Sequence, residues 1–186
     1  MAEVILQTTR LHLRRWEDGD LALWQAHLNT PQVKQHLGGV QDAEQVAASF
    51  ARARQAWDED GFSFLPVERA EDGLFLGMCG LARIQTESAP AELRDAIQIG
   101  WQLRSDCWGQ GYATEAAAAM LDFGFSRFDW PVIVAQTSEN NIGSWRVMQR
   151  LGLRRRAELD YVDPDYPPQD NPTMIWSIAR EERPAA

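Results

Sequence analysis

Two glycines, Gly109 and Gly111, lie where a predicted strand passes into a predicted helix. In the strand, Ala96–Leu103, apolar and polar residues alternate, and in the helix apolar residues recur at helical spacing. The residues on that helix face are Ala113, Ala116, Ala117, Met120, Leu121 and Gly124. Glycines let the backbone pass close to a ligand, and the free N–H groups of a first helical turn favour a phosphate. The segment therefore predicts a pyrophosphate-binding turn, with a ligand-free tight turn as the alternative.

Two other glycine-rich phosphate sites do not fit this segment. A dinucleotide-binding fold requires a third glycine where this chain has Thr114. A P-loop requires a lysine after its last glycine, and the only lysine in the chain is Lys34. A different class of phosphate-bearing ligand is therefore expected.

A second motif, Asn141–Leu153, follows another predicted strand, Val132–Thr137. Together with Trp108–Ala116 it resembles the GNAT superfamily of acyl-CoA-dependent N-acetyltransferases, in particular the RimJ/RimL-like branch that modifies protein N-termini and amino groups. The first segment has the branch's pattern Trp-Gly-x-Gly-Tyr-Ala-Thr-Glu-Ala at every fixed position. The second has its Asn-x-x-Ser and Leu-Gly, with Leu153 where the branch has Phe.

The resemblance extends along most of the chain. Thr9–Arg14 resembles the family's first strand, Leu74–Leu81 its third, and Met174–Ile178 its last. This likeness implies one GNAT-like α/β domain over residues 1–186, with its core at about 8–180. The implied central sheet is mixed and mostly antiparallel, with about six to seven strands and helices on both faces. Two parallel strands are expected to splay apart at the cofactor site.

Local patterns predict the remaining elements. The first helix spans about Asp20–Asn29, and the second begins at Asp42 with Gln45 completing a capping box. Strands are predicted at Phe62–Glu68 and Leu74–Ile84, joined by a turn. The polar segment Gln85–Asp95 is predicted to be a loop. The resemblance implies the order strand, two helices, three strands, helix, strand, helix and strands.

The charge of the chain is unevenly distributed. The net charge of −9 argues against general nucleic-acid binding. Residues 141–156 nevertheless contain five arginines and no acidic residue. These arginines are Arg146, Arg150, Arg154, Arg155 and Arg156. They predict a local cationic patch for the phosphates of coenzyme A, with a solvated helix face and turn as the alternative.

The remaining composition favours a soluble, cytoplasmic protein without a membrane segment. The two cysteines, Cys79 and Cys107, are interpreted as small buried side chains rather than a disulfide or a catalytic thiol. The three histidines are isolated and show no metal-ligand spacing, so they are interpreted as ordinary strand and helix residues and no metal is expected. These histidines are His12, His27 and His36.

The resemblance implies a set of cofactor-binding residues for acetyl-CoA. They are Trp101, Gln102, Leu103, Trp108, Gly109, Gln110, Gly111, Tyr112, Ala113, Asn141, Ser144 and Arg150. The strand backbone would pair with the pantetheine amides like an added strand, and the glycine turn would hold the pyrophosphate. Asn141 would contact the pantetheine arm, although asparagine also suits a helix N-cap. Trp101 would wall the acceptor pocket.

The catalytic groups are less fixed by the resemblance. Either Ser144 or a water would protonate the departing thiolate, because the family's usual tyrosine acid is replaced by Met148, and a plain packing role is the alternative for Ser144. Gln98 takes the position of the branch's carboxylate base and could bind a water but cannot titrate. Glu115, in a first helical turn, is interpreted mainly as a complement to the helix dipole. The base is left open among a water chain and four carboxylates: Glu68, Glu158, Asp163 and Asp165.

Two functions follow from these residues. The first is an acetyl-CoA-dependent N-acetyltransferase that acts on a primary amine, either a protein N-terminus or a small molecule. The alternative is a non-catalytic acyl-CoA-binding or sensing module, because the tyrosine and the carboxylate are missing. No nucleic-acid or membrane partner is expected, and a homodimer is implied by the family only.

Overall fold

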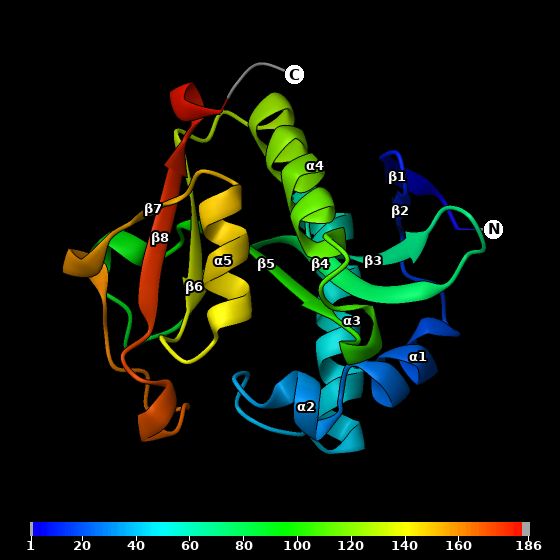
Figure 1. Ribbon diagram of the computed structural model, residues 1–186, viewed down its shortest axis with the longest axis horizontal. Helices are drawn as coiled ribbons and strands as arrows, with labels where there is room; N and C mark the ends of the chain where they lie inside the picture. Colours follow the sequence, from blue (N-terminus) through cyan, green and yellow to red (C-terminus); the bar gives the residue numbers. More distant parts are fainter. Residues whose placement is uncertain (1, 184–186) are drawn as a thin grey trace.

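The computed structural model describes residues 2–183, which form strands and helices in the order shown in Figure 1. The strands are β1 (Val4–Gln7), β2 (Leu11–Arg14), β3 (Phe64–Arg69), β4 (Phe75–Arg83), β5 (Ile97–Leu103), β6 (Val132–Thr137), β7 (Arg154–Arg155) and β8 (Met174–Ala179). The α-helices are α1 (Asp20–His27), α2 (Pro31–Lys34), α3 (Ala43–Asp60), α4 (Tyr112–Arg127) and α5 (Ile142–Arg150). The strands form one sheet in the order β1-β2-β3-β4-β5-β6-β8-β7. All paired strands run antiparallel except β5 and β6.

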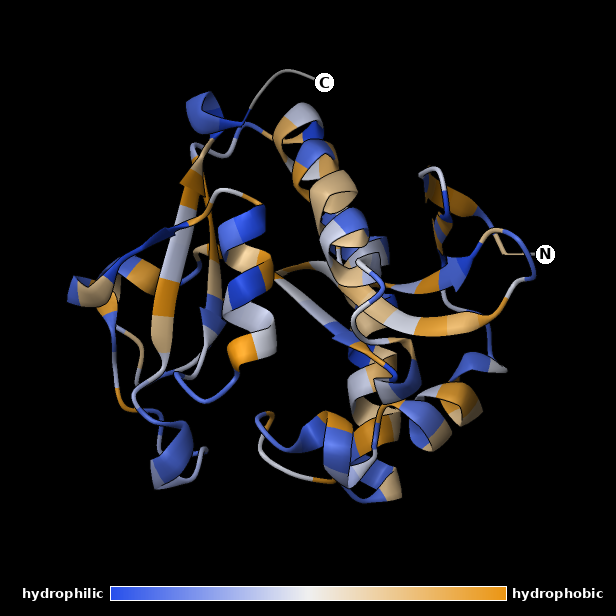
Figure 2. Cartoon of the chain, in the orientation of Figure 1, coloured by the Kyte–Doolittle hydropathy of each residue, from blue (hydrophilic) through white to orange (hydrophobic). Residues whose placement is uncertain are grey.

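Helices cover both faces of the sheet, and β4 at its centre is buried on both sides. Leu76, Cys79 and Leu81 of β4 belong to the core beneath α4 and α5. Phe75 and Met78 belong to a second core, which holds α1 and α3 on the opposite face. Both α4 and α5 alternate between hydrophobic and hydrophilic residues along their length (Figure 2). The apolar residues therefore fix which face each helix covers.

The predicted α/β fold is confirmed, and several elements agree closely with the sequence. Strand β6 has the predicted bounds, and Asp42 and Gln45 make both hydrogen bonds of the predicted capping box before α3. The sheet has eight strands instead of six to seven, because the short edge strands β1 and β7 carry little sequence pattern. Helix α2 was not expected. Pro31 ends no helix but occupies the first turn of α2, where proline is well tolerated and Thr30 caps the N-terminus.

The parallel strands β5 and β6 separate as they leave the sheet. They share a single register pair, Gln98 with Val134, near their amino ends. Figure 1 shows β5 running away from β6 towards its carboxyl end. The splayed parallel strands expected from the family resemblance are thus present, and they open the sheet between α4 and α5.

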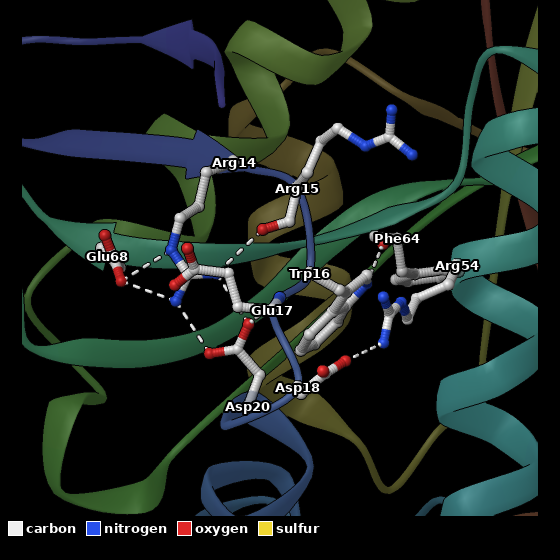
Figure 3. A network of polar contacts seen from close by, with 9 residues as sticks. All are labelled: Arg14, Arg15, Trp16, Glu17, Asp18, Asp20, Arg54, Phe64 and Glu68. Carbon is white, nitrogen blue, oxygen red and sulfur yellow. Dashed lines mark hydrogen bonds and ion pairs between the residues drawn. The ribbon is translucent and has the colours of Figure 1, made fainter. Parts of the chain in front are cut away.

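A buried ion-pair network joins β2, α1 and β3 (Figure 3). The Arg14 guanidinium donates to both carboxylate oxygens of Asp20 at 2.7 and 2.8 Å and to Glu68 at 2.7 Å. Burial alone would lower the pKa of Arg14, but the hydrogen bonds to these two carboxylates raise it, so the guanidinium stays charged. The network fixes the start of α1 on the sheet and engages Glu68, one of the candidate bases.

Candidate active site

A cavity of about 1040 Å³ lies where β5 and β6 diverge. Its walls come from the end of β5, the glycine turn, the start of α4, the inner face of α5 and residues 32–37. It brings together all the residues expected to bind the cofactor: Trp101, Gln102, Leu103, Trp108, Gly109, Gln110, Gly111, Tyr112, Ala113, Asn141, Ser144 and Arg150. Residues from two motifs that are some 30 positions apart in sequence therefore face one space.

The glycine turn has the backbone conformation that the sequence predicts. Gly109 and Gly111 have φ values of +76° and +82°, which side chains disfavour, and Gly111 is the N-cap of α4. The exposed Trp108 side chain donates from Nε1 to the carbonyl of Leu103 at 2.9 Å and so ties the turn to the end of β5. The buried hydroxyl of Thr114 has no hydrogen-bond partner among residues 2–183. An anion at this helix start would fit these free donors.

Arg10, just before β2, clamps the start of α4 from outside the sheet. Its Nε donates to Glu115 at 2.7 Å, and its Nη1 donates to the carbonyl of Gln110 at 3.0 Å. Thr8 also donates to Glu115, at 2.5 Å. Partial burial works to raise the pKa of Glu115, but the hydrogen bonds from Thr8 and Arg10 lower it overall. No local sequence pattern indicates this clamp, in which Glu115 is held as a charged structural partner.

The turn that begins α5 places Asn141 and Ser144 beside the same cavity. The Asn141 side chain accepts from the Ser144 N–H at 3.4 Å, so the N-cap interpretation of Asn141 is confirmed. The Ser144 side chain is half-buried. Met148 is buried one turn further on and has no proton to donate. Of these residues, only Ser144 is suited to proton transfer.

A smaller cavity of about 320 Å³ adjoins the first. Both are lined by His36, Leu37, Trp101, Gln102, Asn141 and Ser144. The smaller cavity is also lined by Asp163 and Asp170, both buried, and by Tyr161 and Tyr166. Burial and the negative charges of the nearby aspartates raise the pKa of Tyr166. Its described lining includes no Lys or Arg, so this cavity is anionic.

Gln98 lies at the inner end of the smaller cavity and links the two parallel strands. Its Oε1 accepts from Gln136 Nε2 at 2.8 Å, and Gln136 in turn accepts from the Tyr161 hydroxyl at 2.7 Å. This bonding gives Gln98 a structural task that the sequence did not indicate.

Among the carboxylates considered as bases, Asp163 lines the smaller cavity. Glu158 is paired with Arg156 at 2.6 Å, and Asp165 is exposed in the loop after β7. Neither lines the two cavities. Position along the chain could not separate these carboxylates, because ion pairing and burial decide which of them is available as a base.

The five arginines between residues 141 and 156 divide into two groups. Arg146 and Arg150, on α5, line the larger cavity. The other three form ion pairs elsewhere: Arg154 with Glu182, Arg155 with Asp160 and Arg156 with Glu158. Of the five arginines, only Arg146 and Arg150 thus form the cationic wall of the larger cavity, and the last three do not line it.

The two cysteines are free and buried. Cys79 lies in the core, and its complete burial raises the pKa of its thiol. Cys107 lines the larger cavity, where burial and then the Asp106 carboxylate raise its pKa. A protonated thiol is a poor nucleophile, in agreement with the interpretation of both as packing residues.

Comparisons with known proteins agree with this arrangement. Residues 10–154 match the family described as the acetyltransferase (GNAT) domain. The uncharacterized protein YkkB of Bacillus subtilis (strain 168) is 32% identical over 153 residues, which cover 82% of this chain and 86% of YkkB. None of the helices within residues 2–183 combines the length and hydropathy needed to span a membrane.

Solved structures share the fold. An acetyltransferase from Agrobacterium tumefaciens str. C58 aligns with a TM-score of 0.77 at 25% identity, over 93% of this chain and 92% of that chain. RimL, a ribosomal L7/L12 alpha-N-protein acetyltransferase in complex with coenzyme A, aligns with a TM-score of 0.76 at 18% identity, over 97% and 99% of the two chains. At that identity the likeness to RimL is one of fold.

Proposed function

This chain belongs to the GNAT family of acetyltransferases, and on that premise we propose that it transfers the acetyl group of acetyl-CoA to a primary amine by direct attack in a ternary complex. One observation supports this proposal above the others. The glycine turn before α4 and the Asn141–Ser144 turn of α5 face one cavity at the point where β5 and β6 diverge. When bound there, acetyl-CoA supplies an activated thioester.

The larger cavity has the chemistry to hold coenzyme A. The first N–H groups of α4 and the turn at Gly109–Gly111 bind the pyrophosphate, with Arg146 and Arg150 supplying positive charge. Beyond the Gln98–Val134 pair, the edge of β5 that faces β6 has no strand partner, so its backbone groups can pair with the pantetheine amides, apart from the Leu103 carbonyl that accepts from Trp108. Asn141 supports the arm while capping α5.

Ser144 and Trp101 line both cavities, which supports this junction as the place where the two substrates would meet. Ser144 is the proton donor to the leaving thiolate, directly or through a water. Trp101 lies between the cofactor arm and the acceptor space, because it lines both cavities. The anionic lining of the smaller cavity favours an acceptor that enters as an ammonium ion.

The first test is calorimetric titration of the protein with acetyl-CoA. Wild type should bind one acetyl-CoA per chain, and Gly111→Trp should abolish binding because the indole fills the turn. Gly73→Trp is the matched control, because Gly73 also has a positive φ but lies in a distant turn. This variant should bind acetyl-CoA normally. Absence of binding by folded wild type would contradict the proposal.

The second test measures coenzyme A release with a panel of primary amines and N-terminal peptides. Release that depends on the amine supports the transferase, and Ser144→Ala should lower kcat by about 10- to 100-fold, at or below the usual contribution of a general acid. Tight binding of acetyl-CoA without transfer to any amine would instead favour the acyl-CoA-binding module.

A further inference from the structure

His36 is the titratable group that both cavities share. It lies in the turn after α2, and its Nδ1 is 2.7 Å from Oδ1 of Asp170, which is 134 residues away in sequence. The imidazole is partly exposed, whereas the aspartate side chain is almost wholly buried. Because Nδ1 is engaged by Asp170, Nε2 is the ring nitrogen left to face a ligand.

Asp170 is an unusual carboxylate for a structural role. Its Oδ1 accepts from the buried Ser138 hydroxyl at 3.0 Å as well as contacting His36. Its Oδ2 is buried and has no hydrogen-bond partner among residues 2–183. A buried carboxylate that is only half satisfied gains most from a positive charge beside it. His36 is the neighbour that can acquire such a charge by taking a proton.

Several other charged or titratable groups line the two cavities or lie close to His36 in sequence. They are Asp163, Tyr161 and Tyr166 in the smaller cavity, Cys107, Tyr112, Glu115, Arg146 and Arg150 in the larger one, and Lys34 two residues before His36. Glu115 is neutralised by Arg10, and Lys34 Nζ donates to Gln41 at 3.3 Å. Asp163 and Asp170 are the two carboxylates that line the smaller cavity together with His36.

We propose that His36, oriented by Asp170, is the general base that deprotonates the acceptor ammonium in this enzyme. This inference rests on the proposed function and supplies the base that the sequence left open. A base for this reaction must lie beside both the acceptor and the cofactor, and His36 lines both cavities. Asp170 is the positioning residue, which fixes the ring orientation and stabilises the imidazolium.

The proton balance is complete with the groups named. The acceptor RNH₃⁺ gives one proton to Nε2 of His36, and the neutral amine then forms its N–C bond to the acetyl carbon as the C–S bond breaks. A second proton leaves the nitrogen as the amide forms, and one proton reaches the thiolate through Ser144 or water. The imidazolium returns its proton to solvent, so each turnover releases one proton.

The test compares kcat/KM against pH for wild type, His36→Asn and Asp170→Asn. The probes are spermidine and a peptide with a free α-amino group and one lysine. Asparagine at position 36 can still donate to Asp170 but cannot take a proton. We expect its kcat/KM to fall at least 100-fold at pH 7 and to approach wild type near pH 9.5 to 10, where the amine loses its proton unaided, around the pKa of about 10.4 for a lysine-type amine.

Asp170→Asn provides the second, independent readout. The kcat/KM of this variant should begin to rise at a lower pH than that of wild type and should reach a lower plateau, because a neutral amide no longer stabilises the imidazolium. His12→Asn, on β2 away from both cavities, is the matched control and should follow wild type. Acetyl-CoA affinity is measured for every variant to verify that the cofactor site is intact.

The outcomes separate the two proposals. If His36→Asn and Asp170→Asn keep the wild-type pH profile within about threefold while transfer proceeds, the base assignment is overturned and the transferase stands. If wild type binds acetyl-CoA but transfers to neither probe at any pH, the proposed function fails and the base assignment fails with it. A deficit of His36→Asn at pH 7 that disappears near pH 9.5 to 10, together with the shifted profile of Asp170→Asn and an unchanged His12→Asn, supports the dyad.

Discussion

Gly111 illustrates how one missing side chain supports a binding site. Its φ of +82° strains any other residue by about 1–2 kcal/mol, and a Cβ there would lie 3.5 Å from Nη2 of Arg10, an ordinary contact. We therefore expect Gly111→Ala to fold but to bind acetyl-CoA about tenfold more weakly, because the strained turn no longer points its N–H groups at one centre. Calorimetry checks this.

Gly73→Ala is the matched control for that variant. Gly73 also has a positive φ, +71°, and open space around its Cβ, but it lies in the turn between β3 and β4. It should lose similar stability and no acetyl-CoA affinity. Equal affinities of the two variants would show that the conformation of Gly111 does not matter for the cofactor.

Glu115→Gln tests the clamp that holds the glycine turn. The native pKa of Glu115 lies below its ordinary value of 4.5, so its stabilising contribution is complete above pH 4.5 and is lost as pH falls through the lowered value. We expect the variant to be about 1 kcal/mol less stable at pH 6, given the exposure of Arg10. Urea unfolding at several pH values should show this difference shrinking only below pH 4.5; a difference independent of pH would contradict it.

At the scale of elements, the Arg14 network decides how α1 meets the sheet. Asp20→Asn leaves Arg14 buried beside a neutral amide, and loss of one partner of a buried ion pair typically costs about 3–5 kcal/mol. Asp18→Asn is the control (Figure 3): it removes an ion pair with Arg54 in which the Asp18 side chain is almost fully exposed, and it should cost less than about 1 kcal/mol. Similar midpoints of unfolding for both variants would refute the distinction.

The elements that the sequence predicted well are those whose signals are local. The capping box before α3 and the apolar run of β6 are each contained within a few consecutive residues. The short strand β7 has two residues and depends on its pairing with β8, so no periodicity announces it. Helix α2 was missed because a proline can end one helix or begin the next.

The candidate site likewise has parts that local sequence patterns predict and parts that they do not. The glycine turn and the Asn141–Ser144 turn are consecutive residues with a distinctive pattern, and both were predicted. The contacts of His36 with Asp170 and of Arg10 with Glu115 span 134 and 105 residues, and neither partner carries a local signal. Such pairs depend on the packing of loops that one sequence does not specify.

At the scale of the whole molecule, charge is sorted between the two cavities. The chain carries a net charge of −9, yet Arg146 and Arg150 stand over the larger cavity, while aspartates line the smaller one. On the proposed function, the phosphates of acetyl-CoA would meet the arginines and an acceptor ammonium ion would meet the aspartates. This sorting is consistent with a ternary complex, in which both substrates occupy the site together.

Binding at the larger cavity should stabilise the entire fold, because its walls come from β5, α4, α5 and residues 32–37. Acetyl-CoA at 100 times its Kd adds about 2.7 kcal/mol to the free energy of unfolding, which for a chain of this size raises Tm by roughly 5–10 °C. The double variant Arg146→Gln/Arg150→Gln should show a smaller rise in Tm at the same acetyl-CoA concentration. Added salt should change that rise less than it does in wild type. Arg154→Gln, whose arginine pairs with Glu182 outside the cavity, should keep the full rise. Scanning calorimetry with and without acetyl-CoA measures these shifts. An equal rise in Tm in wild type, the double variant and Arg154→Gln would mean that the bound phosphates lie away from α5. That result would contradict the proposed position of the cofactor.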